Sequence, residues 1–242
     1  MTHSSFPTVD PALVPAISME QMREVDRIMI EDLHIELIQM MENAGRNLAR
    51  LARRRFGPSQ VLVLAGSGGN GGGGLVAARH LANWGVEVAV VLGGDPEDLG
   101  PVPAHQLDVL ERMGVPVLPE PQPADLYVDA LIGYSLRGDP RGRIAELIHW
   151  LSDRDEPTLS LDTPSGLDVT TGLAGNPCVV ASATLTLAAP KTGLLGPPQV
   201  GELYLADISV PPSVYRAFDM AMPAGLFIED TVVGLAMPSS EA

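Results

Sequence analysis

The chain has 242 residues, 45% of them hydrophobic, which suits one large domain with a single buried core. Its formal net charge is −15 at pH 7, so its surface repels polyanions and we expect no nucleic-acid partner. An anionic small ligand remains compatible with this charge, because backbone amides can hold a phosphate without net positive charge.

In chain order, the first predicted elements are an arm and two helices. Residues 1–17 are polar and contain prolines, so we expect a flexible N-terminal arm. Ser18 and Gln21 form a capping-box pattern, which predicts that a helix begins there. A second helix is predicted from about 36 to 56, and the arginines at 53–55 are interpreted as cations that complement the helix dipole.

Strands and helices alternate after this point. The predicted helices cover 75–85, 104–113 and 144–151, and the predicted strands cover 61–65, 86–92, 115–118, 125–132, 158–162, 183–188 and 202–207. Such alternation implies an α/β protein with right-handed crossovers, a mostly parallel sheet and helices on both faces. We expect one domain over 18–212 and, because 213–242 is only weakly periodic, a C-terminal tail without assigned elements.

The most informative stretch is VLVLAGSGGNGGGGLVAARHL, residues 61–81. Gly66, Gly68 and Gly71 satisfy G-x-G-x-x-G between a predicted strand and a predicted helix, so they lie at a strand–turn–helix corner rather than in a linker. The amides at 72–74 are expected to point out of the helix N-terminus, where free N–H groups and the dipole bind phosphate.

Two common nucleotide-binding motifs fit this stretch poorly. A P-loop is excluded because no Lys-Ser/Thr pair follows the glycines. In a Rossmann-type NAD dehydrogenase an acidic residue ends the second strand. Here that residue would have to be Asp95, which lies beyond two further glycines.

Asp129 and Asp162 each lie at the end of a predicted strand. Ligands of doubly wound sheets bind outside the carboxyl ends of the strands, so both aspartates and the Gly-rich loop can meet at one cleft. Partial burial there would raise a carboxyl pKa toward the range useful for proton transfer. For either aspartate alone, capping of the following turn is an equal alternative; convergence with the loop favours function.

The remaining polar residues limit the possible chemistry. Ser165 could act as a nucleophile only beside a histidine base. The five histidines, at 3, 34, 80, 105 and 149, lie on the arm or in helices and their approaches, so we expect neither a hydrolase triad nor a zinc site. Asn70, Asp129 and Ser165 offer hard oxygen ligands that suit an alkali or alkaline-earth cation.

Cysteine usage and hydropathy bear on the compartment. Cys178 is the only cysteine, so no internal disulfide can form, which is typical of a reducing compartment. The first eighteen residues lack the basic and apolar regions of a secretory signal, and no stretch reaches the length and hydrophobicity of a membrane span. We therefore expect a soluble cytoplasmic protein that does not bind membranes.

Six segments, in order, resemble one family, the NAD(P)H-hydrate epimerases with their N-terminal YjeF-type domain, across roughly residues 18–212. They are MMENAGRNLA (40–49), AGSGGNGGGGLVAARHL (65–81), VDALIGYSLRG (128–138), LDTPSGLDVTTG (161–172), ATLTLAAPKTGLL (183–195) and GELYLADISVP (201–211). The resemblance implies a Rossmann-like three-layer α/β/α sandwich and a homodimer. It is to a standalone epimerase, since the chain ends too soon for the dehydratase domain of some members.

The implied reaction interconverts the R and S epimers of hydrated NADH and NADPH, which carry a hydroxyl at C6 of the nicotinamide ring. Asp162 matches the family's substrate-contacting aspartate, the expected acid/base for C6–O cleavage and re-formation. Asn70, Asp129 and Ser165 match its K+ ligands. The matching substrate-binding residues form two loops: Gly69, Asn70, Gly71, Gly72 and Gly73; and Gly133, Tyr134, Ser135, Leu136, Arg137, Gly138 and Asp139.

The sequence departs from the family pattern within these loops. Gly69 and Gly73 replace the usual Asn and Asp, and Tyr134 replaces a Thr. These changes favour one alternative, a catalytically inactive nucleotide-binding or interaction module; a second is a Rossmann-type nucleotide-dependent oxidoreductase. Lys191, the only lysine, lies in the family's A-P-K block, and we hypothesise that it supports the cleft.

Overall fold

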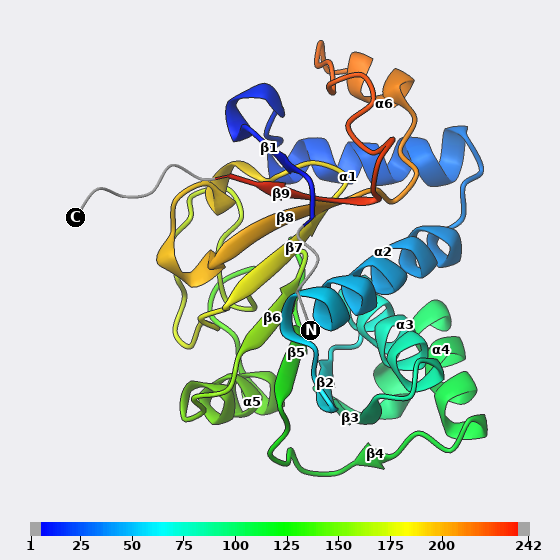
Figure 1. The fold of residues 1–242 in the computed structure, drawn as a ribbon, viewed down its shortest axis with the longest axis vertical. Coiled ribbons are helices and arrows are strands. Elements are labelled where there is room, and N and C mark those ends of the chain that lie inside the picture. Colours follow the sequence, from blue (N-terminus) through cyan, green and yellow to red (C-terminus); the bar gives the residue numbers. More distant parts are fainter. Residues whose placement is uncertain (1–5, 237–242) are drawn as a thin grey trace.

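The computed structural model describes residues 6–236, which contain one nine-stranded sheet with strand order β1-β9-β8-β7-β6-β5-β2-β3-β4 (Figure 1). Neighbouring strands are parallel except β8 and β9. The strands are β1 Thr8–Val9, β2 Gln60–Ala65, β3 Glu87–Leu92, β4 Val117–Leu118, β5 Leu126–Ala130, β6 Thr158–Leu161, β7 Ala183–Leu187, β8 Glu202–Ala206 and β9 Val232–Leu235. The predicted α/β class with a mostly parallel sheet is confirmed.

Helices cover both faces of the sheet. They are α1 Met19–Arg27, α2 Leu37–Leu51, α3 Gly69–Asn83, α4 Pro101–Arg112, α5 Gly142–Ser152 and the short α6 Pro212–Arg216. In Figure 1, α2, α3 and α4 lie on one side of the sheet and α5 lies on the other. Within the described residues, no helix is long and apolar enough to cross a membrane.

Side chains that alternate in direction along β2 explain the two apolar cores, one on each face of the sheet. Val61 and Val63 of β2 pack into a core with residues of α2 and α3. Leu62 and Leu64 point the other way and pack with Leu147 of α5. Because successive side chains of a strand face opposite sides, a strand buried on both faces reads as a continuous apolar run.

The first helix begins, and the second begins and ends, as their sequences predict. The Ser18 hydroxyl accepts the Gln21 N–H at 3.2 Å, and the Gln21 side chain accepts the Ser18 N–H, which completes the capping box of α1. The helix of α2 continues through a π-helical turn, Ala52–Phe56, and ends at Gly57, whose φ of 61° lies in the left-handed region.

Two of the arginines at the end of this helix form ion pairs with acidic residues near the C-terminal strands. Arg54 forms an ion pair with Asp230 at 2.6 Å, and Arg55 forms one with Glu202. Helix-dipole complementarity therefore describes only part of their role, because they also join the helix to the C-terminal strands.

The prediction of a flexible arm is wrong for residues 6–17, and 1–5 lie outside the described residues. Thr8 of β1 pairs with Gly234 of β9, and Phe6 and Ile17 are buried. The C-terminal tail, 213–242, to which we assigned no elements, contains most of α6 and all of β9 up to residue 236. Strands β1 and β9 are short, and each pairs with residues distant in sequence. The local hydrophobic periodicity therefore did not predict them.

Candidate active site

A cavity of about 570 Å³ opens at the carboxyl end of the central strands, within the range of small-molecule sites. It is lined by the Gly-rich loop after β2, by residues 131–135 after β5, and by Asp162 after β6. Its outer walls come from α1 and α2. The predicted convergence at one cleft is therefore found for the loop and Asp162. It is not found for Asp129, which is not among the lining residues.

The helix after the Gly-rich loop begins earlier than its sequence predicts. α3 begins at Gly69 with Gly68 as its N-cap, and the Gly72 N–H already donates to the Gly68 carbonyl at 3.1 Å. The first N–H groups of a helix have no partner inside it. The amides available to an anion are therefore those of residues 69–71, and the prediction of free amides at 72–74 is wrong.

Close backbone contacts explain why the turn consists of glycines. A Cβ on Gly71 would lie 1.8 Å from the Gly66 carbonyl oxygen, and a Cβ on Gly66 would lie 1.9 Å from the Leu131 carbonyl oxygen. Neither oxygen belongs to a flexible side chain, so no side chain fits without moving the backbone.

The two loop glycines that depart from the family pattern differ in the space around them. A Cβ at Gly69 would lie 3.4 Å from the terminal methyl of Met41, at the end of a flexible side chain. A Cβ at Gly73 would lie 2.7 Å from a Leu161 methyl, inside the core. Gly69 therefore has room for a side chain, whereas Leu161 occupies the space that a residue at 73 would need.

Asp129 is fully buried in β5 and its carboxylate is held by the chain itself. It accepts the Ser165 hydroxyl at 2.5 Å, the Ser165 N–H at 2.8 Å and the Ser160 hydroxyl at 2.8 Å. Burial raises the pKa of Asp129, and these hydrogen bonds oppose the rise. Two of the three predicted cation ligands, Asp129 and Ser165, are thus in direct contact.

Asn70 lies in the first turn of α3 and lines the cavity. Its side-chain nitrogen is buried and has no hydrogen-bond partner within residues 6–236. A buried amide normally has its hydrogen bonds satisfied. This unsatisfied amide is therefore where a ligand could bind.

Asp162 is held from two sides. It follows β6 with a φ of 65° and is 4% exposed. One carboxylate oxygen contacts the ammonium of Lys191, and the other accepts the Tyr134 N–H at 3.2 Å. Lys191 is fully buried and also donates to the Leu187 carbonyl at 3.0 Å. Lys191, which we hypothesised to support the cleft, therefore contacts the predicted catalytic aspartate. The sequence did not predict this particular contact.

The second predicted substrate loop is divided by the structure. Gly133, Tyr134 and Ser135 line the cavity. Residues 136–139 are not among the lining residues, and Asp139 instead accepts the Asn176 N–H at 2.9 Å. Of the first loop, Gly69, Asn70 and Gly73 line the cavity, whereas Gly71 and Gly72 are not among the lining residues.

Asp26 is a polar lining residue that the sequence analysis missed. It projects from α1 into the cavity, and its carboxylate accepts the Tyr134 hydroxyl at 2.5 Å. Met22, Asp26 and Ile30 all line the cavity at a spacing of four residues, which places them along one helix face. An aspartate within that apolar stripe was the available signal.

Known proteins resemble the chain along most of its length. The profile of the family described as YjeF-related protein N-terminus matches residues 37–193. An NAD(P)H-hydrate epimerase from Dehalogenimonas lykanthroporepellens is 50% identical, over 87% of this chain and 88% of that protein. The bifunctional NAD(P)H-hydrate repair enzyme Nnr of Salinibacter ruber is 38% identical over 83% of this chain and 42% of that protein.

The fold comparison agrees with the sequence comparison. The crystal structure of the yeast protein ynu0 superposes with a TM-score of 0.80 at 25% identity, covering 92% of this chain and 100% of that chain. The family match spans more than half of the chain, and a 50% identical relative covers most of both lengths. The chain therefore belongs to the YjeF-related N-terminus family, the family of the NAD(P)H-hydrate epimerases.

Proposed function

We propose that this protein interconverts the R and S epimers of hydrated NADH and NADPH in nicotinamide nucleotide repair, as an isomerase. The observation that carries the proposal is Asp162, which lines the cavity and pairs with the buried Lys191. The chain is 50% identical, over 87% of its length, to a protein named as such an epimerase. The α3 N-terminus beside the pair suits a pyrophosphate.

Asp162 is the group we assign to proton transfer at C6. Its position at a strand end, lining the cavity, allows contact with a bound ring, and Lys191 compensates its charge when it is ionised. Loss of the C6 hydroxyl needs a proton on the departing oxygen, and return of water needs a base. A carboxyl group fixed by an ammonium and a backbone N–H can supply either role without leaving its place.

We further propose that K+ binds at Asn70, Asp129 and Ser165. Their side chains offer the oxygen ligands that a hard cation prefers. When bound, the ion would supply positive charge beside the Asp129 carboxylate. We also expect a homodimer in the cytoplasm that binds neither nucleic acid nor membranes.

The direct test is the rate of R/S equilibration of freshly prepared hydrated NADH and NADPH, followed by chromatography with potassium present. Wild type should accelerate equilibration, and Asp162→Asn should remove the acceleration. If wild type does not exceed the spontaneous rate, the protein is instead a catalytically inactive nucleotide-binding or interaction module. Gly69, Gly73 and Tyr134 are then the residues that distinguish its cleft.

A further inference from the structure

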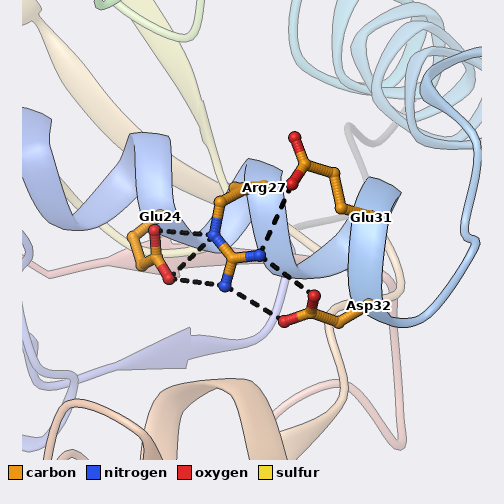
Figure 2. Close-up of polar contacts among 4 residues, drawn as sticks. All are labelled: Glu24, Arg27, Glu31 and Asp32. Atoms are coloured by element: carbon orange, nitrogen blue, oxygen red, sulfur yellow. Dashed lines mark hydrogen bonds and ion pairs between the residues drawn. The ribbon is translucent and has the colours of Figure 1, made fainter.

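A second carboxyl group enters the cavity from the outer helix. The acids around Asp26 on this helix face outward, where Arg27 is hydrogen-bonded to Glu24 and Asp32 and forms an ion pair with Glu31 (Figure 2). Asp26 takes no part in that exposed network. It lines the cavity instead, on the same helix face as apolar neighbours.

Tyr134 connects the two carboxyl groups of the cavity. Its hydroxyl donates to Asp26 at 2.5 Å, and its own backbone N–H donates to Asp162 at 3.2 Å. Both carboxyl groups are thereby fixed relative to one residue of the loop after β5. Both carboxyl groups also line the same cavity.

The environments of the two carboxyl groups differ. Asp162 contacts a buried ammonium, whereas Asp26 faces a neutral phenol. Burial raises the pKa of Asp26, the Tyr134 hydrogen bond and the charge of Lys191 oppose the rise, and the charge of Asp162 adds to it. Burial and Asp26 also raise the pKa of Tyr134, against the weaker effect of Arg23. Two carboxyl groups in unlike surroundings can divide acid and base roles.

We propose that Asp26 is a second proton-transfer group of the epimerisation, paired with Asp162; this rests on the proposed function. The Asp26 carboxylic acid protonates the C6 hydroxyl, the C6–O bond breaks as the N1 lone pair forms an N1=C6 bond, and water leaves. A water molecule then adds to the other face of C6, its proton passes to the Asp162 carboxylate, and the N1=C6 electrons return to N1. The opposite epimer reacts by the reverse sequence, with Asp162 protonated and Asp26 ionised at the start. Proton exchange with water restores the first state between turnovers of the same epimer.

The test compares pH profiles of kcat for wild type, Asp26→Asn and the control Glu24→Gln, which changes an exposed acid of the same helix. Asp26→Asn should lower kcat by about 10²–10⁴-fold, the usual contribution of general acid–base catalysis, and should remove one limb of the profile. Calorimetric titration with NADH should give unchanged affinity for Asp26→Asn, and Glu24→Gln should match wild type throughout. These controls separate a chemical role from a structural one.

Tyr134→Phe provides an independent test if Asp26→Asn does not fold. Loss of a hydrogen bond that lowers the pKa of Asp26 should move the limb belonging to Asp26 to higher pH. The proposal is overturned if Asp26→Asn keeps wild-type kcat and both limbs, or if Tyr134→Phe leaves the profile unmoved, while Asp162→Asn is inactive. Wild type without any activity would instead overturn the proposed function, and this inference with it.

Discussion

Replacing Lys191 by Met removes the ammonium from a buried ion pair. The Lys191 side chain is 0% exposed and that of Asp162 is 5% exposed, so water cannot replace the lost partner of the carboxylate. Breaking a buried pair from one side costs about 3–5 kcal/mol, because a charge is left uncompensated. For a chain of this size the melting temperature should fall by roughly 6–20 °C.

Urea and thermal unfolding at neutral pH measure this loss. Arg112→Met is the matched control, because it breaks a surface ion pair whose side chains are 76% and 52% exposed, and it should leave both midpoints unchanged. Adding Asp162→Asn to Lys191→Met should recover part of the loss, since the orphaned charge is then gone. A Lys191→Met variant as stable as the control, or a double variant no more stable than Lys191→Met, would refute this role of the buried ion pair.

Four further predictions follow from individual residues. Gly71→Ala should destabilise the protein by at least the roughly 1–3 kcal/mol of overpacking, whereas Gly68→Ala, with nothing within 4 Å of its Cβ, should melt close to wild type; equal melting temperatures contradict the close contact. Because burial raises the pKa of Asp26, the contribution of this residue to stability is full below the ordinary carboxyl pKa of about 4 and is lost as pH rises through the raised value. The urea midpoint of wild type should therefore fall relative to that of Asp26→Asn over that window, and parallel curves would argue against the raised pKa. Potassium at about 100 times its dissociation constant should stabilise wild type by about 2.7 kcal/mol relative to a bulky organic cation, and Ser165→Ala should lose this effect; equal stabilisation of both proteins tells against the proposed site. Gly69→Asn should fold, since only the end of Met41 is near, and should tighten dinucleotide binding by about 0.5–1.5 kcal/mol through an added hydrogen bond; unchanged affinity in calorimetry contradicts this.

The central sheet was predictable because its signals are local. Apolar runs such as 61–65 and 158–162 are buried on both faces, and their ends fix which polar residues reach the ligand edge. The edge strands were not predictable in the same way. Thr8 finds its partner at Gly234, and a two-residue strand has too few positions to show alternation.

The site was predictable only in part, for a related reason. Asp162 and Asn70 lie in recognisable motifs, but the contact of Lys191 with Asp162 depends on how the loop after β7 folds back. Consecutive glycines resemble a loop because glycine is a poor helix former. In the structure, the backbone packs closely at Gly71, where only glycine fits, and the glycines are helical. α3 therefore begins at Gly69 instead of at the predicted residue 75.

The most direct measurement of the proposed reaction is epimerisation of hydrated NADH in ¹⁸O-labelled water with potassium present. Cleavage of the C6–O bond followed by addition of water predicts that wild type accelerates inversion and that each inversion places one ¹⁸O at C6. Asp162→Asn should do neither above the spontaneous rate. Wild type that fails to accelerate inversion, or that inverts C6 without incorporating ¹⁸O, would contradict the proposed chemistry.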